Sequence, residues 1–308
     1  QNVKHIFYPC IPKERAEIHG ADNHFNCPMV IAYAEVIRAN IDALRENDVI
    51  LHNPFLPYNN DKALARRLFD EFRPFSVTMD EVKNALELAW AEDRRFKTDI
   101  KKKGEKVLCY LKETGGRGIV LSGRPYHLDP EVNHGIPALL TSMGLAVLTE
   151  DSVSHFGNVK RPLRVLDQWM YHSRLYEAAD FVSRQENLEL VQLNSFGCGP
   201  DSVAAEQAQE ILHKSGKIYT IIKIDEAGNL GAVKIRLRSL KAAMEAKKKN
   251  QGEKAETESI PKKNIFTKEM RSKYTILAPQ MAPIHFALFQ EAIRSEGYRF
   301  EILSAVDK

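Results

Sequence analysis

Cysteine is scarce in this chain, which has four in 308 residues. A disulfide scaffold uses far more for its length, so we expect free thiols in a reducing, cytoplasmic setting, available for metal or redox chemistry. The four cysteines show none of the CxxC spacing that is typical of zinc knuckles and bacterial ferredoxins. Their spacing alone therefore does not indicate a metal site.

A strong charge of one sign and long apolar runs are missing too. The formal net charge of +3 is small for this length and gives no reason to expect a nucleic-acid partner. No apolar run approaches the roughly 20 residues that a membrane helix needs, so we expect no membrane partner. The chain also lacks a GxxxxGK(S/T) phosphate loop. It does not begin with Met, and we expect it to be part of a longer chain.

Apolar runs typical of buried strands alternate with helical patterns along most of the sequence. We predict strands at about residues 4–8, 49–52, 118–122, 145–149, 188–193, 217–224, 274–278 and 298–303. We predict helices at about residues 28–44, 61–72, 80–112, 133–143, 166–185, 203–213, 232–249 and 283–295. This alternation predicts an α/β fold with doubly wound, mostly parallel (Rossmann-like) sheets and helices on both faces.

Composition shifts divide the chain into four parts. Residues 1–115 are expected to form a first Rossmann-like α/β subdomain, and residues 116–246 a second one. Residues 247–272 are rich in charge and read as a linker. Residues 273–308 read as the opening βαβ unit of a further, truncated domain, because one such unit cannot bury its own sheet.

The most distinctive stretch is residues 195–202, Ser-Phe-Gly-Cys-Gly-Pro-Asp-Ser, which links a predicted strand to a predicted helix. Pro in a first turn and Asp or Ser beside it are typical of a helix start. Cys198 would lie at the positive end of the helix dipole, which favours the thiolate, the form that binds metal. We call this turn the Cys198 elbow.

Cys10 and Cys27 stand in similar settings, each beside Pro at a predicted junction between elements. Three thiolates that converge at one edge would suit an iron–sulfur cluster with one iron open to water or substrate. The alternative is that they are ordinary, partly buried thiols. Cys109 lies in an apolar helical pattern, and we expect it in the core.

Arg124 directly follows the predicted strand 118–122, so it should lie at the carboxyl edge of the sheet, where ligands of such folds bind. Cys10 and Cys198 also follow strands and could share that edge. Arg124 could hold a phosphate or carboxylate, and His127 or His134 could act as a proton donor. A turn with structurally satisfied side chains remains the alternative.

Four segments carry a resemblance to a known family: residues 7–10, 25–30, 122–130 and 195–201. Together they resemble the dehydratase-like (DUF2229-type) region of large CoA-substrate-specific enzyme activase proteins. Those proteins are related to the subunits of 2-hydroxyacyl-CoA dehydratases and benzoyl-CoA reductases. The resemblance covers about residues 1–245, and the tail from Tyr274 resembles the start of the next dehydratase-like domain.

The resemblance implies a [4Fe–4S] cluster held by the thiolates of Cys10, Cys27 and Cys198. In the family, an ATP-hydrolysing activase passes one low-potential electron to that cluster, which reduces an acyl-CoA for radical dehydration or reduction. The partners implied are the activase, an acyl-CoA and the rest of a longer chain. The ATPase part is absent from this sequence, so we expect the chain alone neither to hydrolyse ATP nor to turn over substrate.

Two other functions remain open at this stage. The chain could be a non-catalytic electron-relay or scaffold module of a larger activase protein. It could instead be a small-molecule-binding α/β domain whose cysteines are incidental.

Overall fold

The computed structural model describes residues 3–195, 197–224, 230–249 and 266–303. The chain forms two compact units, residues 1–257 and 258–308. The second unit begins within the predicted linker, most of which lies outside the described residues. No helix among the described residues is long and apolar enough to cross a membrane.

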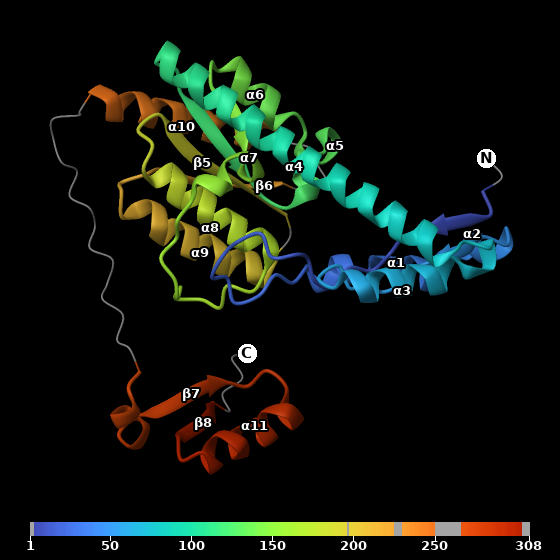
Figure 1. Cartoon of the computed structure of the whole chain (residues 1–308). Coiled ribbons are helices and arrows are strands. Elements are labelled where there is room, and N and C mark those ends of the chain that lie inside the picture. Colours follow the sequence, from blue (N-terminus) through green and yellow to red (C-terminus); the bar gives the residue numbers. More distant parts are fainter. Residues whose placement is uncertain (1–2, 196, 225–229, 250–265, 304–308) are drawn as a thin grey trace. The chain divides into compact units, whose positions relative to one another are not determined.

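The first unit alternates strands and helices (Figure 1). Its strands are β1 (His5–Phe7), β2 (Ile50–His52), β3 (Gly118–Ser122), β4 (Ala146–Thr149), β5 (Leu188–Ser195) and β6 (Tyr219–Ile224). Its α-helices are α1 (Pro28–Asn40), α2 (Asp42–Glu46), α3 (Asp61–Phe72), α4 (Met79–Thr114), α5 (Pro130–Asn133), α6 (Ile136–Ser142), α7 (Glu150–Val153), α8 (Met170–Ser183), α9 (Gly199–His213) and α10 (Leu230–Lys249). Short 3-10 helices are η1 (Arg73–Phe75), η2 (Pro125–Leu128) and η3 (Ser154–Phe156).

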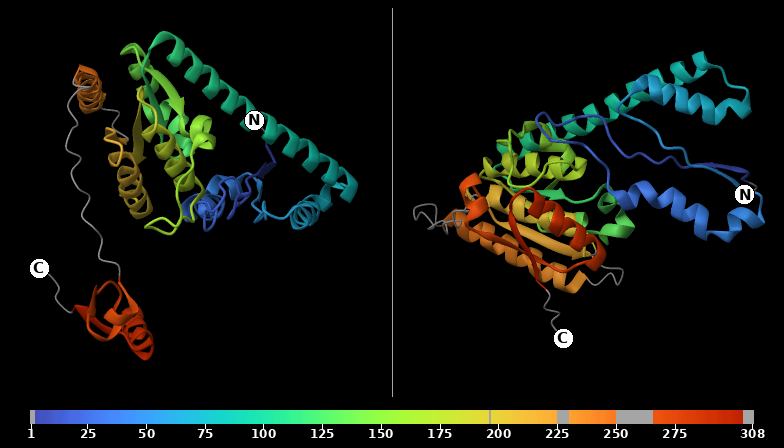
Figure 2. Two further views of the ribbon diagram at one scale, coloured as in Figure 1. Left: turned by 60° about the vertical axis from the view of Figure 1, so that its left-hand side comes forward. Right: turned by 90° about the horizontal axis from the view of Figure 1, so that it is seen from below.

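The central sheet has the strand order β4-β3-β5-β6, and every pairing in it is parallel. Side chains alternate between its two faces, as the pleat of a strand requires. One face packs against α4, α7, α8 and α9, and the other against α6 and α10. The predicted doubly wound α/β fold with helices on both faces is therefore confirmed (Figure 2).

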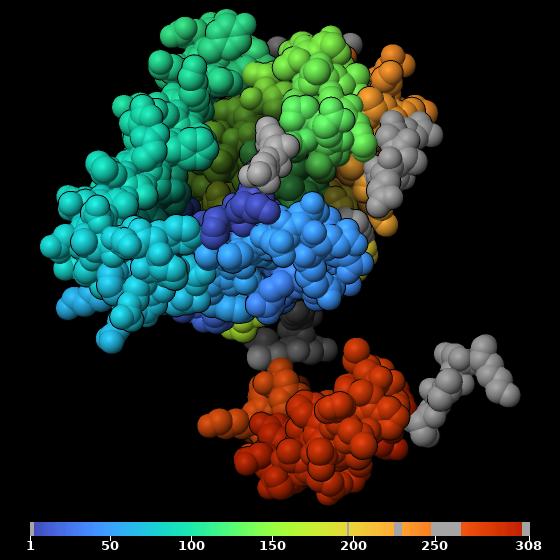
Figure 3. All heavy atoms as spheres, turned by 90° about the vertical axis from the view of Figure 1, so that its right-hand side faces the viewer, coloured from blue at the N-terminus to red at the C-terminus, as the bar shows by residue number. Residues whose placement is uncertain are grey.

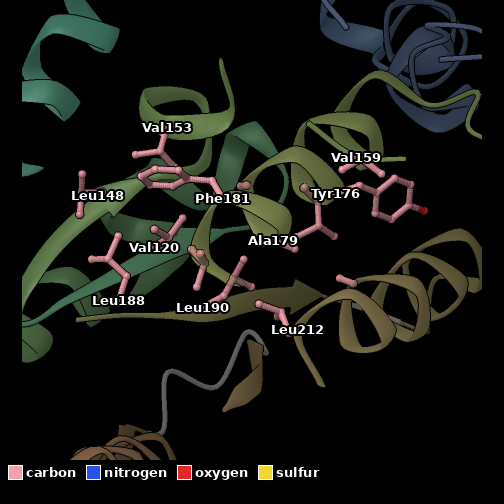
Figure 4. Packing of buried hydrophobic residues seen from close by; sticks show 14 of the residues in the cluster. Val120, Leu148, Val153, Val159, Tyr176, Ala179, Phe181, Leu188, Leu190 and Leu212 are labelled. Atoms are coloured by element: carbon pink, nitrogen blue, oxygen red, sulfur yellow. The ribbon is translucent and has the colours of Figure 1, made fainter. Parts of the chain in front are cut away.

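The larger core lies between the sheet and helices α8 and α9 (Figure 4). Val120, Leu188 and Leu190 point from the strands toward Ala179 and Phe181 of α8, and all five are at least nine-tenths buried. Every residue of β3 and β5 is buried. Strands buried on both faces are typically continuous apolar runs, and β3 follows this pattern, whereas β5 also buries Glu189, Gln192 and Asn194.

Helix α4 is a long element with a capped start. The hydroxyl of Thr78 accepts from the backbone of Glu81, and the Glu81 carboxylate accepts from the backbone of Thr78. A Cβ at Gly104 would lie 2.4 Å from the carbonyl oxygen of Ser152, so glycine lets α4 approach α7. The space-filling view shows the N-terminal part of α4 beside α3 (Figure 3).

Two predicted helices are shorter than the sequence pattern suggested. The one predicted at 133–143 begins only at Ile136, because His134 and Gly135 take left-handed backbone conformations, with φ of 50° and 79°, and separate it from α5. The one at 166–185 begins only at Met170, because Phe25 pairs with Trp169 in a parallel bridge.

The prediction that Cys109 lies in the core is wrong, because its side chain is exposed. Helix α4 turns Val107, Leu108 and Leu111 toward the core cluster instead. An amphipathic helix buries only one stripe, and the adjacent positions 109 and 110 fall outside it.

The second unit contains η4 (Lys268–Ser272), β7 (Thr275–Pro279), α11 (Pro283–Ser295) and β8 (Arg299–Leu303). β7 and β8 pair in parallel, and α11 connects them. The predicted βαβ unit is therefore present. Leu277, Ile284 and Leu288 remain more than half exposed, as expected for a single unit of this kind.

Candidate functional site

The carboxyl ends of β3 and β5 are neighbours at the point where the strand order reverses. The chain runs from β3 to β4 on one side and then returns to β5 on the other side of β3. Ligands of open α/β sheets bind in the crevice at such a switch point. Arg124 follows β3 and Cys198 follows β5, so the fold brings these two predicted site residues together.

The Arg124 guanidinium links the two strand ends. Its Nη2 lies 3.6 Å from Cys198 Sγ and 2.7 Å from Asp201 Oδ1. Cys198 is the N-cap of α9, and Asp201 lies in the first turn of that helix. The Cys198 elbow predicted from the sequence is confirmed in this respect. Arg124 does bind a carboxylate, but one that belongs to its own chain.

Asp201 is the hub of this cluster. It is buried and pairs with Arg124 and with His172 from α8, whose Nε2 lies 2.9 Å from Asp201 Oδ1. Burial alone would raise the pKa of Asp201, but the hydrogen bond with His172 and the charge of Arg124 hold it below its ordinary value. An ionised Asp201 neutralises Arg124 and fixes the position of its guanidinium beside Cys198.

His127 is buried and held by both ring nitrogens. The backbone N–H of Arg124 donates to Nδ1 at 2.9 Å, so the ring proton is on Nε2, which donates to Ser195 Oγ at 2.6 Å. Burial lowers the pKa of His127 to about 4. A Cβ at Gly123 would lie 2.5 Å from Nδ1, so glycine is required there. These contacts hold the turn that carries Arg124.

His134 lies at the C-terminal end of α5 and is partly buried. Its role as a proton donor stays a prediction, as does that of His127.

Cys27 reaches the same region from the N-terminal part of the chain. It is the N-cap of α1, with Pro28 in the first turn, as the sequence predicts. The loop before it is held against the start of α8, because Phe25 N–H donates to Gln168 O and Met170 N–H donates to Phe25 O. The two hydrogen bonds are 2.9 and 3.1 Å long.

Both Cys27 and Cys198 act electrostatically on Arg124. Burial alone would lower the pKa of Arg124, but Asp201, followed by Cys27 and Cys198, raises it. The two cysteines are therefore grouped around one guanidinium, each at the N-terminal end of a different helix.

Cys10 lies apart from the central sheet. It continues β1, which pairs with β2 in a separate two-stranded sheet, so the expectation that Cys10 shares the sheet edge of Arg124 and Cys198 is wrong. The Asn26 side chain donates to Ile11 O at 3.0 Å and thereby ties the chain after Cys10 to the chain before Cys27. Burial, with help from Glu35, raises the pKa of the Cys10 thiol.

Within the part of the chain that the structure describes, no three His, Cys, Asp or Glu side chains lie close enough together to hold a metal ion. That finding concerns a single ion. A cubane is bound through separate irons, so its cysteines stand farther apart than the ligands of one ion. All three candidate thiols are free, and two lie at helix N-termini near Arg124. Positive charge around thiolates suits an anionic cluster.

Sequence reasoning did not assign a role to several residues of the site. In the sequence, Asp201 is a possible helix cap in the Cys198 elbow, and its position in the first turn after a cysteine is the available signal. His172 and Tyr171 carry no such signal, since the packing of α8 alone brings His172 to Asp201 and Tyr171 to Arg124.

A family model described as a CoA enzyme activase uncharacterised domain (DUF2229) matches residues 1–153. Residues 1–153 are therefore similar to this domain family. The DUF2229 region contains Cys10, Cys27 and Arg124, whereas Cys198 and Asp201 lie after it. The resemblance inferred from the sequence is thus confirmed for residues 1–153. No curated protein and no solved structure matches the chain.

Proposed function

We propose that this chain is the iron–sulfur component of a dehydratase- or reductase-type system that acts on acyl-CoA. An ATP-hydrolysing activase, on another domain or protein, supplies the electron. Cys10, Cys27 and Cys198 are the cluster ligands. Bound there, the cluster would supply a single low-potential electron at an iron with an open position.

The observation that carries the proposal is the grouping at the switch point. Cys27 and Cys198 begin two different helices and both act on Arg124, which is itself held by Asp201. Both cysteines lie at the positive ends of helices, and positive charge of this kind favours an anionic iron–sulfur cluster. The family of residues 1–153, whose description names CoA enzyme activases, supports the same class of chemistry.

The chain's own residues would position and tune this site. Arg124 can donate to Cys198 Sγ, and a hydrogen bond to a ligand sulfur is one of the factors that set a cluster's reduction potential. His172 and Asp201 fix that donor in place. Burial and Glu35 raise the pKa of the Cys10 thiol, so iron binding there would have to displace a proton that is held more tightly than usual.

The first test measures iron and acid-labile sulfide after anaerobic purification and reconstitution. We expect about four of each per chain, as a cubane requires. Cys198→Ala should lose most of both, and Cys10→Ala and Cys27→Ala should behave alike. Cys109→Ala is the matched control, because Cys109 is exposed on α4 outside the site, and it should load like wild type.

Two outcomes would contradict the proposal: no iron in the reconstituted wild type, or an equal loss in Cys109→Ala. With a loaded cluster, addition of acyl-CoA would change its spectrum if the chain binds substrate and leave it unchanged if the chain only relays electrons. A small-molecule-binding α/β domain without a cluster is the second candidate. The separation of Cys10 from the central sheet favours it.

A further inference from the structure

A pocket beside the thiols is not used by the proposed function. It lies at the carboxyl ends of β3 and β4, and its cavity volume is ≈ 50 Å³. Gly123, Arg124 and His127 line it from the β3 side, and Glu150 and Arg174 line it from α7 and α8. Two of these side chains place polar atoms in buried positions with few hydrogen-bond partners: Arg174, which is partly buried, and Glu150, which is buried.

Arg174 is the first of them. Its Nε atom is buried and has no hydrogen-bond partner among the described residues. Its guanidinium lies 5.4 Å from the centre of the Tyr171 ring, a contact that leaves its N–H groups available. A buried donor without an acceptor costs on the order of 1–3 kcal/mol, more when charged, so the site is incomplete without an acceptor.

Glu150 is the second. It is buried, and it accepts a long hydrogen bond of 3.4 Å from Gly123 N–H. Burial raises the pKa of Glu150 to about 8, with Asp151 adding to the effect, although the charges of Arg174 and Arg124 oppose it. At neutral pH Glu150 is therefore a protonated group that can donate a hydrogen bond. No described ion pair joins it to Arg174 within 4.0 Å.

The charges in the pocket favour a singly charged ligand. Arg124 is already neutralised by Asp201, which leaves Arg174 as the cation without an ion-pair partner among the described pocket residues. Asp151 also lines the pocket and accepts a hydrogen bond from the Thr149 hydroxyl, so one negative charge is already present. A phosphate dianion would meet too little positive charge here, whereas a carboxylate matches the planar fork of one arginine.

The remaining walls are apolar. Leu121, Leu128 and Leu193 line the same pocket. Pockets of this kind bind ligands through apolar contact and orient them through a few polar groups. The ligand therefore combines a carboxylate with a short apolar chain.

We propose that this pocket binds the carboxylate of a short-chain organic acid, with Arg174 as its cationic partner and Glu150 as a hydrogen-bond donor. The site extends the proposed function, and it does not depend on the cluster because none of its residues is a thiol. The ligand would enter beside Arg124, next to the Cys198 elbow.

The test uses the full chain, purified without iron, so that its result is separate from the fate of the cluster proposal. Binding of n-butyrate is followed by ligand line broadening in NMR, with butyramide and inorganic phosphate run in parallel. We expect butyrate to bind and to be preferred over both. Arg174→Gln should weaken butyrate binding about tenfold or more, as the loss of a charged hydrogen bond implies.

Two further variants sharpen the result. Arg184→Gln changes an exposed arginine at the end of the same helix, paired with Asp180, and should bind butyrate like wild type. Arg174→Lys keeps the positive charge but lacks the planar guanidinium, so its affinity for butyrate should lie between those of wild type and Arg174→Gln. It replaces the Gln variant in the test if that variant does not fold. Equal binding of butyramide, tighter binding of phosphate, no binding of butyrate, or wild-type affinity in a folded Arg174 variant would each overturn the proposal.

Discussion

The central sheet and the N-terminal region, residues 3–75, each place a cysteine at the N-cap of a helix, but on different supports. Cys198 follows β5, whose eight residues are all buried. Cys27 follows a loop beside β1 and β2, strands of three residues each with mostly exposed side chains. A cysteine at a helix N-cap is therefore supported by a buried strand in one region and by short, mostly exposed strands in the other.

This difference indicates where the rigidity of the site comes from. Arg124 and Cys198 are fixed by neighbouring buried strands. Cys27 depends on hydrogen bonds between the loop before α1 and the loop before α8. The N-terminal region should therefore open more easily than the sheet, because it has fewer buried apolar contacts.

The largest loss of unfolding free energy is expected from a substitution that disrupts the ion pairs where the two regions meet. Arg161 pairs with Asp167 and Glu177, both buried, and Asp167 N–H donates to Asp22 in the N-terminal region. Arg161→Met leaves two buried carboxylates unpaired and should cost about 3–5 kcal/mol of unfolding free energy in urea. The exposed pair of Arg184 offers the control, since Arg184→Met should cost about 1 kcal/mol or less. Equal losses of unfolding free energy in Arg161→Met and Arg184→Met would mean that the buried ion pairs stabilise the fold no more than an exposed pair does.

Core truncation tests the comparison directly. Leu190 of β5 is fully buried, so Leu190→Ala should lower the unfolding free energy by about 2–5 kcal/mol. Ile6 of β1 is 38 % exposed, and Ile6→Ala should cost about 1 kcal/mol or less because little apolar surface returns to water. Urea denaturation measures both. The contrast between the regions would disappear if Ile6→Ala cost as much as Leu190→Ala.

The third prediction concerns pH and the pocket of the central sheet. Burial raises the pKa of Glu150 from 4.5 to about 8, so the folded protein holds a proton there that the unfolded chain releases. This stabilises the fold below pH 4.5 and is lost as pH rises toward 8, with Arg174, Arg124 and Asp151 as the charged neighbours. Glu150→Gln should match wild type near pH 4 and exceed it in unfolding free energy by about 4 kcal/mol at pH 8. A stability difference that stays constant across this range would contradict the shift.

The smallest effect is expected from a substitution that removes hydrogen bonds within the N-terminal region. The buried Asn26 side chain donates to Ile11 O and to Glu14 Oε1. Asn26→Ala should cost only about 1 kcal/mol, and hydrogen exchange should accelerate at residues 11–14 and 24–27 rather than in β5. The exposed Asn40 also donates to a backbone carbonyl, and Asn40→Ala should leave exchange in those loops unchanged. Uniform acceleration in β5 would show that the two regions open together.

The elements of the fold were largely predictable because their apolar patterns are strong and locally bounded. Helix α3 was predicted at residues 61–72 and is found there, with Asn60 as its N-cap. Strand β3 was predicted at 118–122 and is also found there. Predictions were wrong where one backbone conformation interrupts a helical pattern, as at His134 and Gly135, or where a distant strand partner delays a helix, as at Trp169.

The candidate site was predictable only in part. Gly, Pro and Asp around Cys198 identify a strand-to-helix turn from sequence, because each residue type has a local conformational preference. Nothing local indicates that Arg124 lies 3.6 Å from Cys198, since 74 positions separate the two residues. His172, Glu150 and Arg174 belong to the same class: ordinary polar residues that acquire a role through their neighbours.

The sequence alone thus determined the strands, most helices and the two cysteine N-caps, and its match to the family model covers residues 1–153. The strand order β4-β3-β5-β6 was decided by tertiary packing, and with it the switch point where Arg124, Cys198 and Asp201 meet. The tertiary structure also placed Cys10 beside a different sheet and left the Nε atom of Arg174 buried without an acceptor among the described residues. Propensity and periodicity act over a few residues, whereas burial and charge pairing depend on which distant segments the fold brings together.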